Sequence, residues 1–178
     1  MLVLIVVVAG ALSYDTRRRL ATFYRTRAPG PFALIWPRFV AGTVLGVVAY
    51  LAGTAAAWLE TALVLGPLPA GRVLLGVAYE AVFLAFAVAV LATAATVGRS
   101  TLATIGTAVV VLLLVLPLAS AVKVLAPWLP TSLMRAPAGL LTGTAPDRYL
   151  PAVALAVVAT AGLLALATAR ARTREPAP

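Results

Sequence analysis

The sequence predicts an all-α, polytopic membrane protein of about five spans. The hydrophobic fraction is 63% and the charged fraction 11%, whereas soluble domains contain about 45–50% apolar and about 25% charged residues. The mean hydropathy is +1.07. The net charge of +9 comes from basic residues that gather between apolar runs. Because that pattern is what membrane topology requires, it predicts membrane insertion and not nucleic-acid binding.

The inventory of reactive side chains is small. The chain has no Cys and no His, and only five acidic residues. Disulfides, thiol nucleophiles, His general bases and the common zinc sites are therefore excluded. The phosphate-binding pattern G-x-x-x-x-G-K-[ST] is absent from the sequence, as are G-x-G-x-x-G and H-E-x-x-H. We expect no catalytic centre, no metal and no cofactor in this chain, so any ATP hydrolysis would belong to a partner.

The first apolar run is shorter than a membrane span. It extends from Met1 to Ser13 and would cover about 20 Å of a hydrocarbon core about 30 Å thick. Three arginines follow it and no basic residue precedes it, which is the reverse of a secretory signal. We interpret it as the inner part of a span whose outer end is missing, in a chain that could begin inside a longer reading frame.

A basic connector, residues 14–38, follows this run. Leu20, Phe23 and Tyr24 lie at helical spacing on one face of a short amphipathic helix, which Asp15 or Thr16 would cap. A Pro and Gly cluster ends that helix, and Trp36 stands where interfacial aromatic residues gather. The three consecutive arginines, Arg17 to Arg19, have two readings. They either set topology and contact anionic lipid, or belong to a docking helix for a cytoplasmic partner, which the aromatic pair favours.

The remaining apolar runs are long enough to cross the membrane. The five predicted spans are, in order, residues 1–13, 39–59, 72–97, 101–122 and 150–169. A Gly- and Pro-rich turn joins the second span to the third, and Gly98 to Ser100 joins the third to the fourth. Pro117 is expected to kink the fourth span. The outer loop, residues 123–149, is irregular, with a short helix or partly inserted loop over residues 131–141.

The distribution of Lys and Arg predicts the orientation. The connector, the turn after the third span and the C-terminal tail hold ten of these residues, and the opposite side holds four. The richer side is expected to be cytoplasmic, which places the N-terminus outside, the C-terminus inside and the protein in the plasma membrane.

Small residues recur at four-residue spacing in the second span. Gly42 and Gly46 form G-x-x-x-G, and Ala49, Gly53 and Ala57 follow on a neighbouring stripe. Such stripes allow helix backbones to approach closely, which favours a packing face within the chain or between subunits. The alternative is chance spacing in a chain rich in Ala and Gly.

Glu80 is the one acidic residue inside a predicted span. It lies eight residues past Arg72, about 12 Å into the membrane. A bare carboxylate there costs several kcal/mol, so we expect Glu80 to be protonated, paired or facing water. It is either a translocation-path or gating residue, or a residue that makes a structural hydrogen bond to a neighbouring helix or snorkels to the outer surface. Glu60, at the outer end of its span, is expected to be interfacial.

The order of these parts resembles the ABC-2-type transporter permeases, the membrane subunits of bacterial exporters that lack their own ATPase. The resemblance rests on the stretch from Asp15 to Pro29, which reads acid, basic run, apolar and aromatic residues, Arg, Thr and Pro. An apolar run from Phe32 to Arg38 follows it. The family's usual Gly before the apolar run is Arg here, and its Gly-Lys pair is Pro37-Arg38. The short turn at Gly98 and the outer Trp128-Leu129-Pro130 segment also agree.

The resemblance implies a role, partners and a missing span. Family members have six spans, so these five would match the second to the sixth. It implies a homodimer or a paired permease with two cytoplasmic ATPase subunits docked beneath, and ATP bound only by those partners. The coupling role would fall on Asp15, Arg17, Arg18, Arg19, Leu20, Phe23, Tyr24, Arg25 and Arg27.

Two rival functions stay open. One is a non-transporting membrane assembly or accessory protein, and the other is a proton-coupled secondary transporter that uses Glu80. The aliphatic spans would suit a lipid, drug or other hydrophobic cargo, and would equally suit helices that face only lipid and one another.

Overall fold

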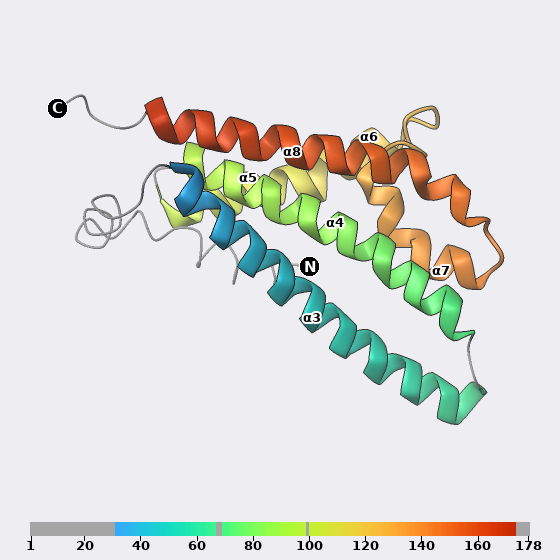
Figure 1. Cartoon of the computed structure of the whole chain (residues 1–178). Helices are drawn as coiled ribbons and strands as arrows, with labels where there is room; N and C mark the ends of the chain where they lie inside the picture. Colours follow the sequence, from blue (N-terminus) through green and yellow to red (C-terminus); the bar gives the residue numbers. More distant parts are fainter. Residues whose placement is uncertain (1–30, 67–68, 99, 174–178) are drawn as a thin grey trace.

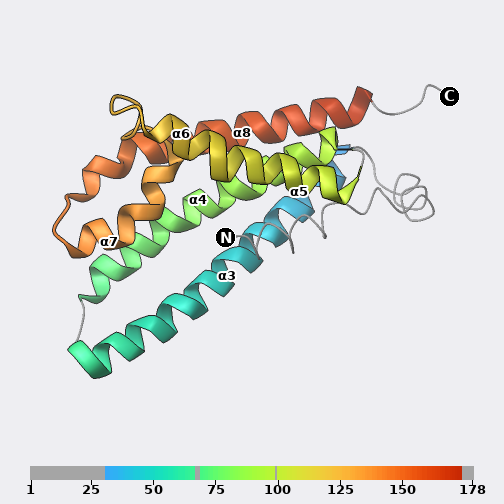
Figure 2. The same cartoon turned by 180° about the vertical axis from the view of Figure 1, so that it is seen from behind.

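The computed structural model describes residues 31–66, 69–98 and 100–173, and these residues form helices and turns without a strand (Figures 1 and 2). Four helical segments in this part are long and apolar enough to cross a membrane: Ile35–Val64, Ala70–Val97, Thr101–Ser120 and Pro146–Ala171. The prediction of an all-helical fold is therefore confirmed for the described residues, and these four helices suggest a membrane-embedded protein. The first predicted span and most of the connector lie outside the described residues.

Helix α3 (Pro31–Leu65) begins earlier than the sequence predicts. The last residues of the predicted connector, from Pro31 to Arg38, are therefore helical, and the boundary between connector and span stays a prediction. Pro31 suits the first helical position, where its backbone N–H would have no partner. Pro37 removes one backbone hydrogen bond close to the start of the helix, and the helix continues past it. Gly66 ends the helix with a φ of 97°, a conformation that favours glycine.

Helix α4 (Ala70–Val97) is the core of the bundle. It lies between α3 and α8 in both views, and it packs against α3, α5, α7 and α8. Within its most apolar window 56% of the residues are buried, against 11–17% in the other three candidate spans. The other helices therefore leave most of their apolar side chains at the surface, where lipid rather than water is the suitable solvent.

The fourth predicted span changes its helix type halfway. It consists of α5 (Thr101–Val109), the π-helical turn η2 (Val110–Val115) and α6 (Leu116–Ser120). Within the wide turn the N–H of Leu116 donates to the carbonyl of Val111, five residues back. Pro117 comes next and has no N–H, so the α-helical hydrogen-bond pattern loses one bond at this position even without the π-turn. Where the sequence predicts a kink at Pro117, the structure has a π-helical turn just before that residue.

The outer loop is mostly helical. It contains the 3-10 helix η3 (Pro130–Arg135), helix α7 (Ala136–Leu141) and the 3-10 helix η4 (Pro146–Tyr149), which leads into α8 (Leu150–Thr173). The short-helix alternative for residues 131–141 is confirmed. Leu133, Ala136 and Leu140 are buried, and η3 and α7 both pack on α4. The sequence does not predict this packing.

Candidate functional site

A stripe of polar side chains runs along one face of α3. Thr43, Tyr50, Thr54 and Trp58 recur at intervals of seven and four residues, and each is half-buried. Such spacing places side chains on the same face of a helix. Large apolar side chains of α3, among them Leu45 and others between Val40 and Val64, are exposed instead. Helix α3 is therefore polar toward the bundle and apolar toward its surroundings, the reverse of a soluble amphipathic helix.

Glu80 of α4 lies opposite this stripe. It is half-buried and follows Ala70 by ten residues, about 15 Å along the helix axis. The charge of Glu80 acts on the hydroxyl of Tyr50, and that hydroxyl is hydrogen-bonded to the side chain of Thr54. The carboxyl group of Glu80 on α4 therefore lies within electrostatic range of the phenol of Tyr50 on the neighbouring helix α3.

Two further polar atoms on the same face of α3 have no partner. The hydroxyl oxygen of Thr43 and the indole nitrogen of Trp58 are buried and make no hydrogen bond within the part of the chain that the structure describes. Burying such groups without a partner is unfavourable by about 1–3 kcal/mol each. Thr43, Tyr50 and Trp58 of α3, together with Glu80 of α4, make up a set of half-buried polar side chains that is termed the polar strip.

The N-terminal half of α4 is tied to the predicted outer loop, residues 123–149, by polar contacts. Arg72 donates from its guanidinium to the carbonyl of Leu140 at 3.2 Å. The hydroxyl of Tyr79 donates to the carbonyl of Pro146 at 3.0 Å, and its ring centroid lies 5.5 Å from that of Tyr149. Tyr79 is the neighbour of Glu80 in sequence, so these contacts restrain the rotation of α4 at the position of Glu80.

Two glycines allow this outer contact to be close. A Cβ atom added at Gly76 of α4 would lie 2.7 Å from the Cα of Pro137 in α7. A Cβ atom at Gly139 of α7 would collide with the hydroxyl of Tyr149. The backbone of α7 can approach α4 only because position 76 has no side chain, which is the use of small residues that membrane helix packing favours.

The predicted site residues are not gathered in one place. Glu60 is exposed near the outer end of α3, Gly46 is buried and Gly42 is half-buried. Gly53 is exposed, with no described atom within 4 Å of an added Cβ, and Ala49 and Ala57 are exposed as well. A subunit contact through this stripe stays a prediction. The predicted coupling residues, Asp15, Arg17, Arg18, Arg19, Leu20, Phe23, Tyr24, Arg25 and Arg27, lie outside the described residues.

The polar side chains of α3 were not predicted as site residues. A recurrence of Thr, Tyr, Thr and Trp at positions 43, 50, 54 and 58, inside an otherwise aliphatic run, is a signal that could have found them. Polar residues at helical spacing within a span usually face the bundle interior.

No group of three or more metal-ligating side chains occurs in the described segments.

Comparison of the chain with protein-family models, with curated proteins and with solved structures finds no match. The proposals that follow therefore rest on the residues and their arrangement.

Proposed function

We propose that this chain is the membrane-spanning permease subunit of an ATP-driven exporter of the ABC-2 type, located in the plasma membrane. A separate cytoplasmic ATPase would bind and hydrolyse ATP, and a second copy or a paralogue would complete the membrane unit. The chain itself would carry out no chemistry and would transmit the movement of its partner to the spans.

The observation that carries this proposal is the continuity of α3. The helix begins at Pro31, close behind the basic and aromatic stretch, and continues unbroken for 35 residues. A continuous α-helix is stiff along its axis, so a displacement of the connector would move the whole of α3. Helix α3 is also the least buried of the four candidate spans, which lets it move with little loss of packing.

The polar strip lies where such a movement would act. Tyr50 on α3 lies within electrostatic range of Glu80 on α4, and α4 is held to the outer loop by Arg72 and Tyr79. A shift of α3 against this fixed helix would open or close the strip between them. In this mechanism ATP binding draws the two ATPases together, the connector follows them, and the spans change between inward-facing and outward-facing states.

The decisive experiment is co-purification with an ATPase. The genes that flank this one are searched for an ATPase with a phosphate-binding loop, the tagged chain is produced together with that candidate, and the ATPase recovered per tagged chain is measured. Exchanging Phe23 and Tyr24 for Asp should lower that ratio at least about tenfold, because buried aromatic anchors typically contribute 2 kcal/mol or more to an interface. The control Leu125→Asp changes a residue that is 47% exposed in the outer loop and should leave the ratio unchanged. Normal recovery with the double variant would reject the docking role of the connector.

The Glu80–Tyr50 pair favours a second candidate, a proton-coupled secondary transporter. Glu80→Gln keeps the shape and the hydrogen-bonding capacity of the side chain but cannot release a proton. In reconstituted vesicles with an imposed pH gradient, proton flux that is lost in Glu80→Gln and kept in Glu60→Gln would support this candidate. Equal flux in all three proteins would reject it. If neither ATPase binding nor proton flux is found, a non-transporting assembly role becomes the better proposal.

A further inference from the structure

A segment next to α6 stands out from the side of the bundle. Residues 121–129, termed the α6–η3 segment, leave the end of α6 and return to η3, and both views show them projecting past α8 at one side (Figures 1 and 2). Backbone turns give this segment a defined shape. The N–H of Leu125 donates to the carbonyl of Val122 at 2.9 Å, and the N–H of Trp128 donates to the carbonyl of Leu125 at 2.9 Å.

The α6–η3 segment presents large apolar side chains to its surroundings. Val122, Val124 and Trp128 are 50%, 79% and 56% exposed. The base of the segment is fixed in the protein, because Pro130, the first residue of η3, is buried and η3 packs against α4 and α8. Large apolar residues that gather on a projection with a buried base indicate contact with apolar material outside the chain.

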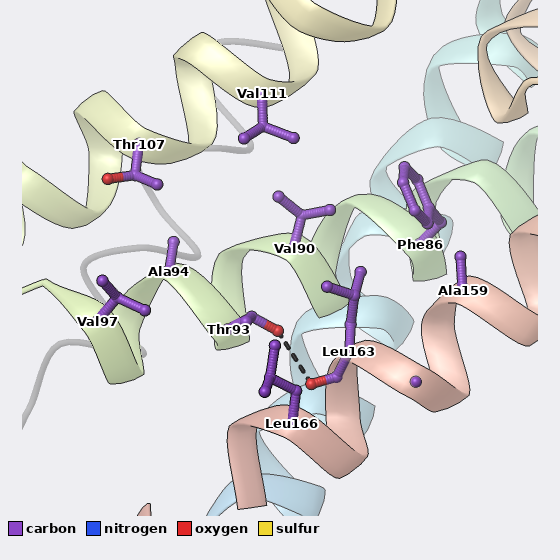
Figure 3. Close-up of a pocket in the computed structure, with 11 residues that line it drawn as sticks. Phe86, Val90, Thr93, Ala94, Val97, Thr107, Val111, Ala159, Leu163 and Leu166 are labelled. Carbon is purple, nitrogen blue, oxygen red and sulfur yellow. Dashed lines mark hydrogen bonds between the residues drawn. The ribbon is translucent and has the colours of Figure 1, made fainter. Parts of the chain in front are cut away.

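The exposed apolar surface of the preceding span leads into this segment. Along that span, Thr107 and Val111 line the hollow between α4, the α5–η2 segment and α8 (Figure 3). Leu114 and Leu118, nearer to the α6–η3 segment, are exposed instead. The surface of the span that would meet lipid therefore continues into the α6–η3 segment without a break in chemistry.

The length of the span sets the depth of the segment. Thr101–Ser120 contains 20 residues, which extend about 30 Å as a helix, and this is the thickness of the hydrocarbon core. Residues 121–129 therefore begin where the hydrocarbon ends. Because the segment turns sideways at this level, it stays in the headgroup region.

The composition of the segment suits the headgroup region. Lys123 stands between Val122 and Val124 and is exposed. A lysine covers apolar surface with its aliphatic stem and extends its ammonium group toward a polar layer. Tryptophan, here Trp128, is enriched where the bilayer meets water. Anionic phospholipids supply both the apolar boundary and the negative charge that this combination of side chains requires.

We propose that the α6–η3 segment anchors the chain in the headgroup region of the leaflet at this end of the bundle. Val122, Val124 and Trp128 lie against the acyl chains, and Lys123 binds the phosphate of an anionic phospholipid. A second copy of the chain is a poorer cover, because a stable protein interface takes about 20–30 residues from each side. The anchor holds η3 at a fixed depth, and it does not depend on the transport proposal.

Fluorescence quenching by nitroxide-labelled lipids measures the depth of the segment. The chain has no cysteine, so Val124→Cys provides one site for an NBD label on the full chain, which is reconstituted in vesicles of phosphatidylcholine and phosphatidylglycerol. A nitroxide near the headgroup should quench this label more than a nitroxide near the end of the acyl chain. Leu114→Cys, within the span, should show the opposite order. Asp147→Cys, at an exposed position in η4, should be quenched by iodide in the water and little by either lipid.

The lipid class is tested with the label at the same position and the headgroup-side nitroxide carried either by phosphatidylglycerol or by phosphatidylcholine. One lysine at a membrane surface favours anionic lipid by a factor of about five. Phosphatidylglycerol should therefore quench more strongly, by up to about fivefold, and Lys123→Gln should remove this preference. Arg148→Gln is the matched control, because Arg148 is an exposed basic residue outside the segment, and it should leave the preference unchanged.

Three results would overturn the proposal. Iodide quenching as strong at Val124→Cys as at Asp147→Cys would show that the segment lies in water. Weak lipid quenching together with disulfide cross-links between two copies of Val124→Cys would show that a second copy covers the segment. A preference for phosphatidylglycerol that is absent, or that Lys123→Gln leaves unchanged, would reject the phosphate contact of Lys123. Trp128→Cys provides an independent position for the label if Val124→Cys does not fold.

Discussion

The contact between Gly76 and Pro137 gives the most direct test of the packing of the outer loop. Gly76→Ala adds one methyl group at a place where α7 leaves no room for it. The new Cβ would lie 2.7 Å from the Cα and 3.1 Å from the Cβ of Pro137. Because the closest of these atoms is a backbone atom, it cannot swing away as a flexible side chain would, and α7 or α4 has to shift.

The size of the effect follows from two opposing contributions. Overpacking of this kind costs about 1–3 kcal/mol. Replacing Gly by Ala in a helix also gains up to about 1 kcal/mol in helix propensity. In local opening, the outer loop detaches while α4 stays helical. The gain in helix propensity is therefore the same in the closed and the open state and does not change the free energy of opening. The free energy of local opening should therefore fall by about 1–3 kcal/mol, and opening should be about 5 to 150 times more frequent.

A single introduced cysteine measures this opening. The chain has no cysteine of its own. Ser132→Cys in η3 is nearly isosteric, and the hydroxyl oxygen of Ser132 is buried without a hydrogen-bond partner in the described residues. A water-soluble maleimide can react with the cysteine introduced by Ser132→Cys only when η3 and α7 have left α4. The labelling rate therefore reports how often this opening occurs. Gly76→Ala should raise that rate by the factor worked out above.

The control is Gly71→Ala on the same helix, where an added Cβ meets no described atom within 4 Å. It makes the same chemical change and should leave the labelling rate unchanged. If Gly76→Ala and Gly71→Ala label at the same rate, α7 does not press on α4 at this point, and the described packing of the outer loop is refuted.

Two further substitutions test single hydrogen bonds. Thr93→Val removes the hydrogen bond to the carbonyl of Leu163 with little change of shape. It should lower the free energy of detergent-induced unfolding by about 0.6 kcal/mol, up to about 1.7 kcal/mol. The control Thr107→Val loses only a hydrogen bond within its own helix and should have a smaller effect, and equal effects would contradict an interhelical role for Thr93. Tyr79→Phe removes the bond to the carbonyl of Pro146 and should cost about 0.5–1.5 kcal/mol in the same assay; an unchanged midpoint would show that this bond does not hold the outer loop.

The spans could be predicted because lipid imposes a simple rule on the sequence. A helix needs about 20 apolar residues to cross the hydrocarbon core, and the run from residue 72 to 97 predicts α4 (Ala70–Val97) to within two residues. The start of α3 at Pro31 was not predicted from the sequence. Pro37 near the start of a helix removes only one hydrogen bond, and α3 includes it.

The site could be predicted only in part. Glu80 stands out because a carboxyl group within an apolar run is costly. Its partner Tyr50 could not be assigned to it, because the two residues lie on different helices. Which faces of α3 and α4 meet depends on their relative rotation, and contacts such as those of Tyr79 and Arg72 set that rotation for α4.

The sequence by itself determined that this protein is built from apolar helices joined by basic and Pro- and Gly-rich segments. This was possible because hydropathy and the interruption of helices by Pro and Gly depend only on short stretches of sequence. The tertiary structure decided which helix is central, how the outer loop folds onto α4, and that α4, α5 and α8 leave a hollow between them. In an Ala- and Gly-rich chain nearly every helix face is apolar and small, so composition does not rank one pairing above another. Close contacts such as Gly76 against Pro137, and single hydrogen bonds such as Thr93 to Leu163, select the arrangement.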